Sequence, residues 1–295
     1  MDIGKLGVWF MTDGMTAAGA AAFARRVEQW GYGALWLPEP PFGRNVLVHA
    51  AWLLANTERL VVASGIANIY GRDPLAMKGA QVALAEQSAG RFLLGIGVSH
   101  APSVEKTRGH IYGKPVPTMR AYVEAMRAAR CTVPQPAQQP KLVLAALGPQ
   151  MLALAAEVAD GAHPYLTTPG HTARARAVIG AKKWLCPEQK VLLETDAGEA
   201  RRKARGALGR SPLLPNYRRN LLSLGFSDDD FAGNLSDRLV DALVAWGDEA
   251  AIRARIREHL DAGATHVCIQ PIGEGPTPYS SADERLLQLL APAND

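Results

Sequence analysis

Few cysteines and no long hydrophobic run occur in this chain of 295 residues. Its three cysteines, Cys131, Cys186 and Cys268, are far apart and outside any C-x-x-C pair, a pattern that argues against a disulfide framework and against a thiolate metal site. No stretch of about 18 apolar residues is available to form a membrane span. The start, with Asp2 and Lys5, lacks the apolar segment of a signal peptide. We therefore expect a cytoplasmic protein with free thiols and no membrane contact.

Excess charge is also small, and several catalytic motifs are missing. The 32 Lys and Arg exceed the 28 Asp and Glu by four, and the basic residues 201–203 are followed by the acidic residues 228–230. No one-sided basic surface of the kind that binds nucleic acid is indicated. H-E-x-x-H, G-x-S-x-G and P-loop motifs do not occur, which removes the usual signals of zinc peptidases, serine hydrolases and P-loop enzymes. We expect no nucleic-acid partner and no metal.

Apolar runs followed by helical sequence recur along the whole chain. The expected strands are residues 6–10, 34–37, 60–66, 92–97, 142–146, 162–166, 190–195 and 266–271. Apolar strands that alternate with helices predict a parallel sheet covered on both faces. Eight such units favour an α/β fold of the (β/α)8 TIM-barrel type over an open sheet. We expect one domain, residues 1–295.

Two segments exceed the usual length of a connection in this pattern. Residues 99–116, after the fourth strand, contain glycines and prolines that disfavour both helix and strand. Residues 196–265, between the seventh and eighth strands, include helical stretches at 198–207, 217–226 and 236–246. We interpret both as insertions into the barrel.

The carboxyl ends of barrel strands, where active sites form, carry a recognisable series of segments. These are Ser64–Pro74, Leu93–Gly97, Ala145–Pro149 and Ala159–Gly161, with Leu214–Arg218 and Ser236–Leu243 further on. Their order and spacing resemble the luciferase-like monooxygenase superfamily, and most closely its coenzyme F420-dependent oxidoreductases. The similarity extends over essentially the whole chain.

This resemblance implies a cofactor site for F420, or alternatively FMN, at the mouth of the barrel. It implies a cis peptide between Gly65 and Ile66 that supports the cofactor ring, and a phosphate at the helix that Gly148 and Pro149 open, where backbone N–H groups are free. The cofactor-binding residues that it implies are Glu39, Ser64, Gly65, Ile66, Asn68, Gly97, Val98, Ser99, Ala146, Leu147, Gly148 and Tyr165.

Two residues are candidates for acid–base catalysis. Glu39 matches the acidic position near the reactive ring in the resembling enzymes, many of which follow it with histidine where this chain has Pro40. His100 is a second candidate, because the ordinary pKa of histidine lies near neutrality. We expect hydride transfer between F420 and a small organic substrate. An FMN-dependent monooxygenase and a non-catalytic flavin-binding barrel remain alternatives, and an apolar helix with Trp52 suggests a homodimer.

Overall fold

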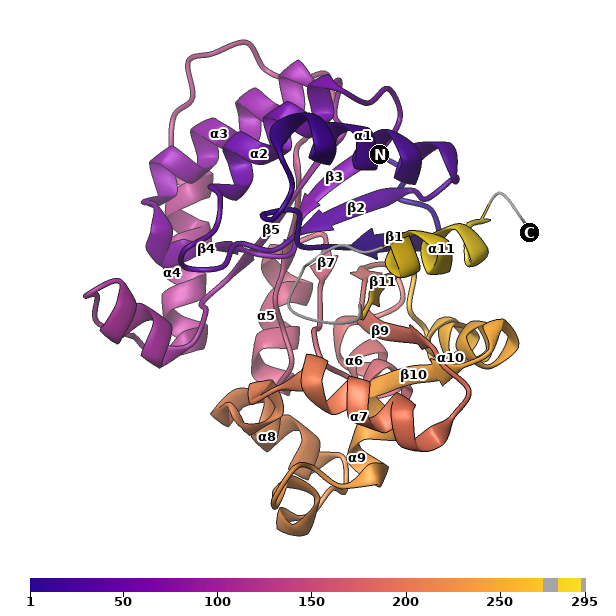
Figure 1. The fold of residues 1–295 in the computed structure, drawn as a ribbon. Helices are drawn as coiled ribbons and strands as arrows, with labels where there is room; N and C mark the ends of the chain where they lie inside the picture. Colours follow the sequence, from indigo (N-terminus) through magenta and orange to yellow (C-terminus); the bar gives the residue numbers. More distant parts are fainter. Residues whose placement is uncertain (273–280, 293–295) are drawn as a thin grey trace.

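The computed structural model describes residues 1–272 and 281–292, in which helices surround a curled sheet of parallel strands (Figure 1). The strands are β1 (Leu6–Trp9), β2 (Ala34–Leu37), β3 (Val61–Ser64), β4 (Ala67–Asn68), β5 (Phe92–Gly97), β6 (Lys141–Leu144), β7 (Gly161–Ala162), β8 (Trp184–Leu185), β9 (Glu188–Leu193), β10 (Val244–Gly247) and β11 (Val267–Pro271). The α-helices are α1 (Ala17–Gln29), α2 (Val46–Ala55), α3 (Pro74–Gln87), α4 (Pro115–Ala128), α5 (Pro149–Val158), α6 (Pro169–Ile179), α7 (Ala197–Leu208), α8 (Pro215–Ser223), α9 (Asp237–Leu243), α10 (Glu249–Asp261) and α11 (Ser281–Leu289).

The strand order explains the curl. Neighbouring strands follow the order β10-β9-β11-β1-β2-β3-β5-β6-β7-β8, with β4 beside β5. Only two residues separate β8, which pairs with β7, from β9, which pairs with β11. The expected α/β fold with a parallel sheet is confirmed, and the sheet is curled.

Local sequence fixes where the helices begin. Asp73 accepts hydrogen bonds from the backbone N–H groups of Leu75 and Ala76, and Pro74 stands in the first turn of α3, as the sequence predicts. Thr16 caps α1 in the same way through Gly19. These caps determine the residues at which α1 and α3 begin.

Side chains alternate between two buried layers. One cluster contains residues from β1, β2, β3, β5, β6 and β11 that contact one another across the curl, including Trp9, Trp36, Cys186 and Cys268. Because no helix contributes to this set, it marks the inner face of the sheet. A larger cluster joins the outer face to the helices. The carboxyl ends of the strands therefore surround a common mouth.

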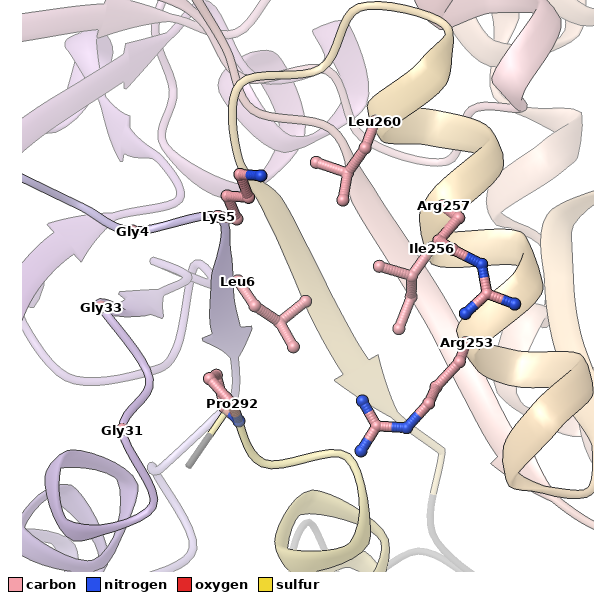
Figure 2. Close-up of a pocket in the computed structure, with 10 residues that line it drawn as sticks. All are labelled: Gly4, Lys5, Leu6, Gly31, Gly33, Arg253, Ile256, Arg257, Leu260 and Pro292. Atoms are coloured by element: carbon pink, nitrogen blue, oxygen red, sulfur yellow. The ribbon is translucent and has the colours of Figure 1, made fainter. Parts of the chain in front are cut away.

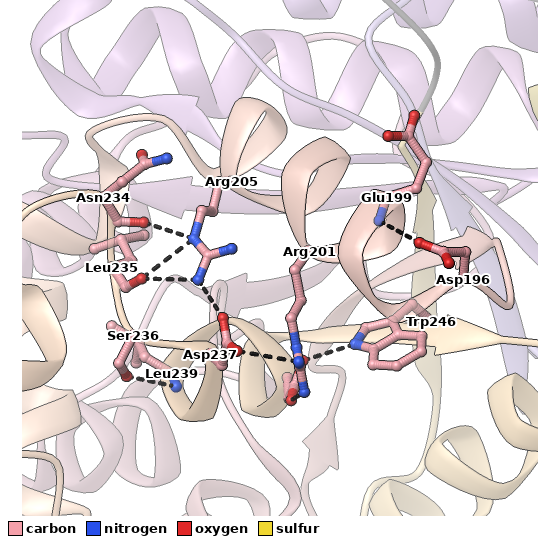
Figure 3. Close-up of polar contacts among 11 residues, drawn as sticks. Asp196, Glu199, Arg201, Arg205, Asn234, Leu235, Ser236, Asp237, Leu239 and Trp246 are labelled. Atoms are coloured by element: carbon pink, nitrogen blue, oxygen red, sulfur yellow. Dashed lines mark hydrogen bonds and ion pairs between the residues drawn. The ribbon is translucent and has the colours of Figure 1, made fainter.

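The region 196–265 contains a strand that the sequence analysis did not predict. Instead of one helical stretch over 236–246, α9 ends at Leu243 and β10 follows, pairing in parallel with β9. In Figure 3, Arg205 of α7 binds the Leu235 carbonyl and Asp237. Arg201 of α7 binds Asp241 of α9 at 2.6 Å, and Trp246 donates to the same carboxylate at 2.8 Å. These contacts hold α7 against α9, and the expectation of a single helix is wrong.

The region 99–116 also differs from its prediction. A π-helical turn, η2 (Ser103–Thr107), lies where neither helix nor strand was expected. Val104 is fully buried there, so its packing outweighs the effect of Gly109 and Gly113, which follow the turn. The 3-10 helices η1 (Ile69–Gly71), η3 (Ser211–Leu213) and η4 (Asp228–Phe231) complete the described elements.

Candidate functional site

A cis peptide bond joins Gly65 and Ile66 between β3 and β4, as predicted. The carbonyl oxygen of Gly65 accepts a hydrogen bond of 3.1 Å from Nε1 of Trp9, at the end of β1. A Cβ atom at Gly65 would lie 2.8 Å from that nitrogen and 3.1 Å from Nε2 of His163. The inner face has no room for a side chain here.

Glycine and small apolar side chains form one half of the mouth. A Cβ atom at Gly97 would lie 2.7 Å from Cδ1 of Ile66 and 3.1 Å from Cβ of Ala145. The half-buried Val98 packs against the outer cluster. Ile66 and Gly97, both predicted cofactor-binding residues, are therefore brought together.

Two other predicted cofactor residues are buried. Ser64 is fully buried, and its hydroxyl exchanges hydrogen bonds with the backbone of Gly95 at 2.8 and 2.9 Å. Ala146 lies in the outer cluster between sheet and helices. Both residues support the strand ends, and their cofactor contacts stay predictions.

Glu39 is held in a nearly buried ion pair with Arg72. One carboxylate oxygen accepts the backbone N–H of Asn68 at 2.8 Å and the other that of Val46 at 3.3 Å. The carboxylate thus joins the end of β2 to β4, α2 and the segment before α3. Asn68 is itself buried, and its side chain accepts from the backbone of Tyr70.

We expect Arg72→Met to destabilise the fold by about 3 to 5 kcal/mol, because it leaves the carboxylate of Glu39 buried without its partner. Urea unfolding measures the change. Arg120→Met is the matched control, since Arg120 pairs with Glu157 in an exposed position where little or no change is expected. Equal stabilities of the two variants would contradict the assigned role of the Glu39 pair.

His100 follows β5 and lies beside the region 196–265. Its ring is 5.5 Å from that of Tyr217 in α8. Burial lowers the pKa of His100, and a hydrogen bond with Asn216 acts in the opposite direction. Ser99 precedes it with a φ of +57° and accepts a hydrogen bond from Tyr112 at 3.2 Å. The predicted catalytic roles of Glu39 and His100 stay predictions.

The amino end of α5 presents backbone N–H groups without a side-chain cap. Its N-cap, Gly148, is exposed and provides no side-chain hydrogen bond. By contrast, Thr168 caps α6. The carbonyl of Leu147 accepts from Nε2 of His171 at 2.9 Å, which fixes the loop before α5. Free N–H groups at a positive helix end suit an anion.

The other half of the mouth carries a polar cluster of which the sequence analysis named only Tyr165, as a cofactor-binding candidate. Lys190 donates to Tyr165 at 2.8 Å, to Gln270 at 3.0 Å and to Glu188 at 3.1 Å. The side chains of Lys190 and Glu188 are 4% and 1% exposed. Burial alone lowers the pKa of Lys190, but the charge of Glu188 and the hydrogen bonds outweigh it and raise that pKa. We call these four residues the polar quartet.

His163 lies on the inner face between the quartet and the glycine half. Its Nδ1 is 2.7 Å from the carbonyl oxygen of Cys186, so this nitrogen carries the proton. Burial lowers the pKa of the ring to about 4. Nε2 is buried and has no hydrogen-bond partner among the described residues. An unpaired acceptor therefore lies beside Gly65.

A cavity of about 460 Å³ lies at the opposite end of β1 (Figure 2). Lys5, Arg253 and Arg257 line it together with glycines and apolar side chains, and it includes none of the predicted site residues. Within residues 1–272 and 281–292, no group of three or more His, Cys, Asp or Glu side chains could hold a metal ion. No helix in the same ranges has the length and apolar character to cross a membrane.

Comparison with known proteins identifies the family of this chain. The family model described as luciferase-like monooxygenase matches residues 3–266. The chain belongs to the luciferase-like monooxygenase family. It is therefore an oxidoreductase of that family, and the predicted resemblance is confirmed.

Relatives of this luciferase-like chain use different cofactors. A 5,10-methylenetetrahydromethanopterin reductase from Methanolobus tindarius is 25% identical over 295 residues, which cover 86% of this chain and 90% of the relative. An F420-dependent secondary alcohol dehydrogenase in complex with an F420-acetone adduct has a TM-score of 0.75 at 14% identity, covering 99% of each chain. An FMN complex of a Baeyer-Villiger monooxygenase from Pseudomonas putida has a TM-score of 0.70 at 14% identity, covering 98% of each. At these identities the two solved structures support the fold.

Proposed function

We propose that this protein transfers hydride between coenzyme F420 and a small organic substrate at the carboxyl-end mouth of its sheet. The observation that carries the proposal is the uncapped, exposed amino end of α5 beside an apolar strand rim. The half of the mouth formed by Gly65, Ile66 and Gly97, which we call the glycine half, suits an uncharged ring. The N–H groups at the start of α5 suit a phosphate. The unpaired Nε2 of His163 is a further sign of a ligand site.

In this proposal the chain holds the cofactor with residues from several strand ends. Gly65, Ile66 and Gly97 support the ring, Val98 and Ser99 border it, and the backbone of Gly148 holds the phosphate. Bound deazaflavin supplies the hydride chemistry, while the protein orients and polarises the ring. Glu39 and Asn68 fix the rim through their hydrogen bonds, and Leu147 sets the loop before α5.

FMN is the second candidate cofactor, favoured by the FMN-bound neighbour. Reduced FMN would permit oxygen activation, whereas deazaflavin acts as a hydride carrier. A non-catalytic flavin-binding protein is the third alternative. Titration of the purified protein with each cofactor, followed by cofactor fluorescence, separates the first two. We expect saturable binding of F420 and none of FMN; the reverse result would overturn the proposal.

Gly148→Asp tests the assigned phosphate position. Aspartate is a good N-cap residue, and the backbone at Gly148 is extended with nothing near the new side chain, so stability should be kept or slightly raised. Its negative charge should repel the phosphate and weaken F420 affinity about tenfold, which is about 1.4 kcal/mol. Gly148→Ala adds a Cβ without charge and serves as control. Unchanged affinity in Gly148→Asp would remove the phosphate from this helix.

We also infer that the curled sheet is a (β/α)8 barrel of one domain with insertions at about 99–116 and 196–265. Hydrogen bonds from Cys186 to Ala162 and from Cys268 to Pro187, both 2.9 Å, support closure between β7 and β11. A homodimer is supported by the exposed apolar side chains of Val48 and Trp52 on one side of α2, and light scattering would detect it. A cytoplasmic location stays a prediction.

A further inference from the structure

We propose that the phenol of Tyr165 exchanges the proton with the substrate oxygen, and that Lys190 is the positioning residue that holds this phenol in place. The inference rests on the proposed hydride transfer. It adds a substrate class: a carbonyl compound in one direction and the corresponding alcohol in the other. A proton must then be given or taken at oxygen whenever hydride is exchanged at carbon.

The hydrogen bonds of the polar quartet leave Lys190 no freedom. Its ammonium group has three N–H donors, and they are matched by acceptors on Tyr165, Gln270 and Glu188 at 2.8 to 3.1 Å. Because the Tyr165 oxygen accepts from Lys190, its own proton points to Gln270 at 3.0 Å. That proton is the one that can turn to a substrate oxygen.

The position of Tyr165 suits contact with a bound substrate. Its ring lies 5.1 Å from that of Trp9, which donates to the carbonyl of Gly65. The ring of Tyr165 is thus separated from Gly65 by the indole of Trp9 alone. Tyr165 is half-buried, whereas Lys190 and Glu188 behind it are buried.

The two other acid–base candidates are less well placed. Both carboxylate oxygens of Glu39 already accept hydrogen bonds, from Arg72 and from backbone N–H groups. His100 contacts the ring of Tyr217, which in turn lies 6.2 Å from that of Tyr165. Of these three side chains, Tyr165 is the one that packs against Trp9, the hydrogen-bond partner of the Gly65 carbonyl.

The charges around Tyr165 suit a proton donor. The titratable groups that face it are Lys190 and Glu188 on β9 and Tyr217 on α8. Burial raises the pKa of Tyr165, and the Lys190 ammonium acts against that rise. The phenol therefore keeps its proton at neutral pH, and a cation stands ready to stabilise the phenolate.

The atoms balance as follows for a carbonyl substrate. The carbon of the C=O group gains hydride, with its electron pair, from reduced deazaflavin, which becomes oxidised. The π electron pair moves to oxygen and takes the proton of Tyr165, so one O–H bond breaks and another forms. The phenolate stays beside the Lys190 ammonium until it takes a proton from bulk solvent after the product leaves. In alcohol oxidation Tyr165 first loses its proton to solvent, and the phenolate then takes the hydroxyl proton while the carbon gives hydride to oxidised deazaflavin.

The first test uses the protein without cofactor. Tyrosine labelled with ¹³C at Cζ gives a resonance for Tyr165 that Tyr165→Phe identifies. In Lys190→Met/Glu188→Gln, which removes the ion pair without leaving a buried charge, we expect the alkaline titration of Tyr165 to begin about one pH unit or more higher. The resonance of Tyr122, which donates to the Arg72 carbonyl, should not move. An unchanged Tyr165 titration would overturn the role of Lys190.

The second test separates this inference from the proposed function. Tyr165→Phe should bind F420 as the wild type does but lose about 10²- to 10⁴-fold in turnover of a carbonyl or alcohol substrate, with the pH profile of kcat flattened. Lys190→Arg should restore part of the loss seen in Lys190→Met/Glu188→Gln. Wild-type turnover in Tyr165→Phe would overturn the inference and leave the function intact. Failure of the wild type to bind F420 would overturn the proposed function. The titration in the cofactor-free protein would still decide whether Lys190 controls the pKa of Tyr165.

Discussion

Below about pH 6.5 the protein is expected to lose stability steeply, because three buried histidines are neutral in the folded state. Burial lowers the pKa of His163 and His266 to about 4 and that of His259 to about 3. Each pKa lies below the value of 6.5 for an unperturbed histidine, so the unfolded chain binds more protons as the pH falls. The contribution of these neutral histidines to the free energy of unfolding is complete above pH 6.5. It is lost as the pH falls from 6.5 to their pKa values in the folded state.

The hydrogen bonds explain why these rings resist protonation. Nε2 of His266 accepts from Nε1 of Trp36 at 3.0 Å, and its Nδ1 donates to the Gly4 carbonyl at 2.9 Å. A proton added at Nε2 of His266 would place two N–H donors, those of His266 and Trp36, against each other. His259 is similarly enclosed by Thr172 and Gln189.

Urea unfolding at several pH values measures the expected slope. Each histidine contributes about 1.4 kcal/mol per pH unit within its window, or about 4 kcal/mol per unit for the three together. His266→Gln should reduce the slope by about a third whatever it does to stability at pH 7. His110→Gln, at an exposed position, is the control. A stability that stays level from pH 7 to pH 5 would contradict the assignment.

Gly65→Val is expected to damage both the fold and the cofactor site. The first added carbon would already overlap Nε1 of Trp9 and crowd Nε2 of His163. Trp9 cannot easily give way, because it is hydrogen-bonded to the Gly65 carbonyl and packed against Tyr165. Overpacking of this kind costs about 1 to 3 kcal/mol.

F420 affinity should fall in the same variant, since the displaced indole or the valine itself must occupy the mouth. Urea unfolding and cofactor titration of one sample measure both effects, and Gly65→Ala should give smaller losses. Gly206→Ala, in α7 with open space around it, is the control and should be neutral or slightly stabilising. Wild-type affinity in a stable Gly65→Val protein would exclude this position from the ring site.

The sequence predicts the repeating framework well because each strand and helix depends on local patterns. Helix caps such as Asp73 and the strand ends at Gly65 and Gly97 follow from neighbouring residues. The strand β10 was missed because its apolar residues continue the pattern of α9. In that position, pairing with β9 decides the conformation, and this partner is about 50 residues away.

The interior polar contacts could not be predicted for the same reason. Lys190 and Glu188 begin a strand whose alternation shows that they share a face, but it does not show that the face is buried. Arg72 resembles an ordinary loop cation until the fold brings Glu39, 33 residues earlier, to it. Such contacts form only when the sheet curls, and the curl cannot be predicted from neighbouring residues in the sequence.

The burial of two thiols on the inner face makes the chain suitable for attaching a single reporter dye. Burial raises the pKa of Cys186 to about 12 and that of Cys268 well above its ordinary value, so neither thiolate is available to a maleimide. Cys131 is partly exposed, and it lies between α4 and β6, at the end of the sheet away from the mouth. A fluorophore can therefore be placed at one known position, without mutagenesis, where it leaves the strand ends that would hold the cofactor untouched.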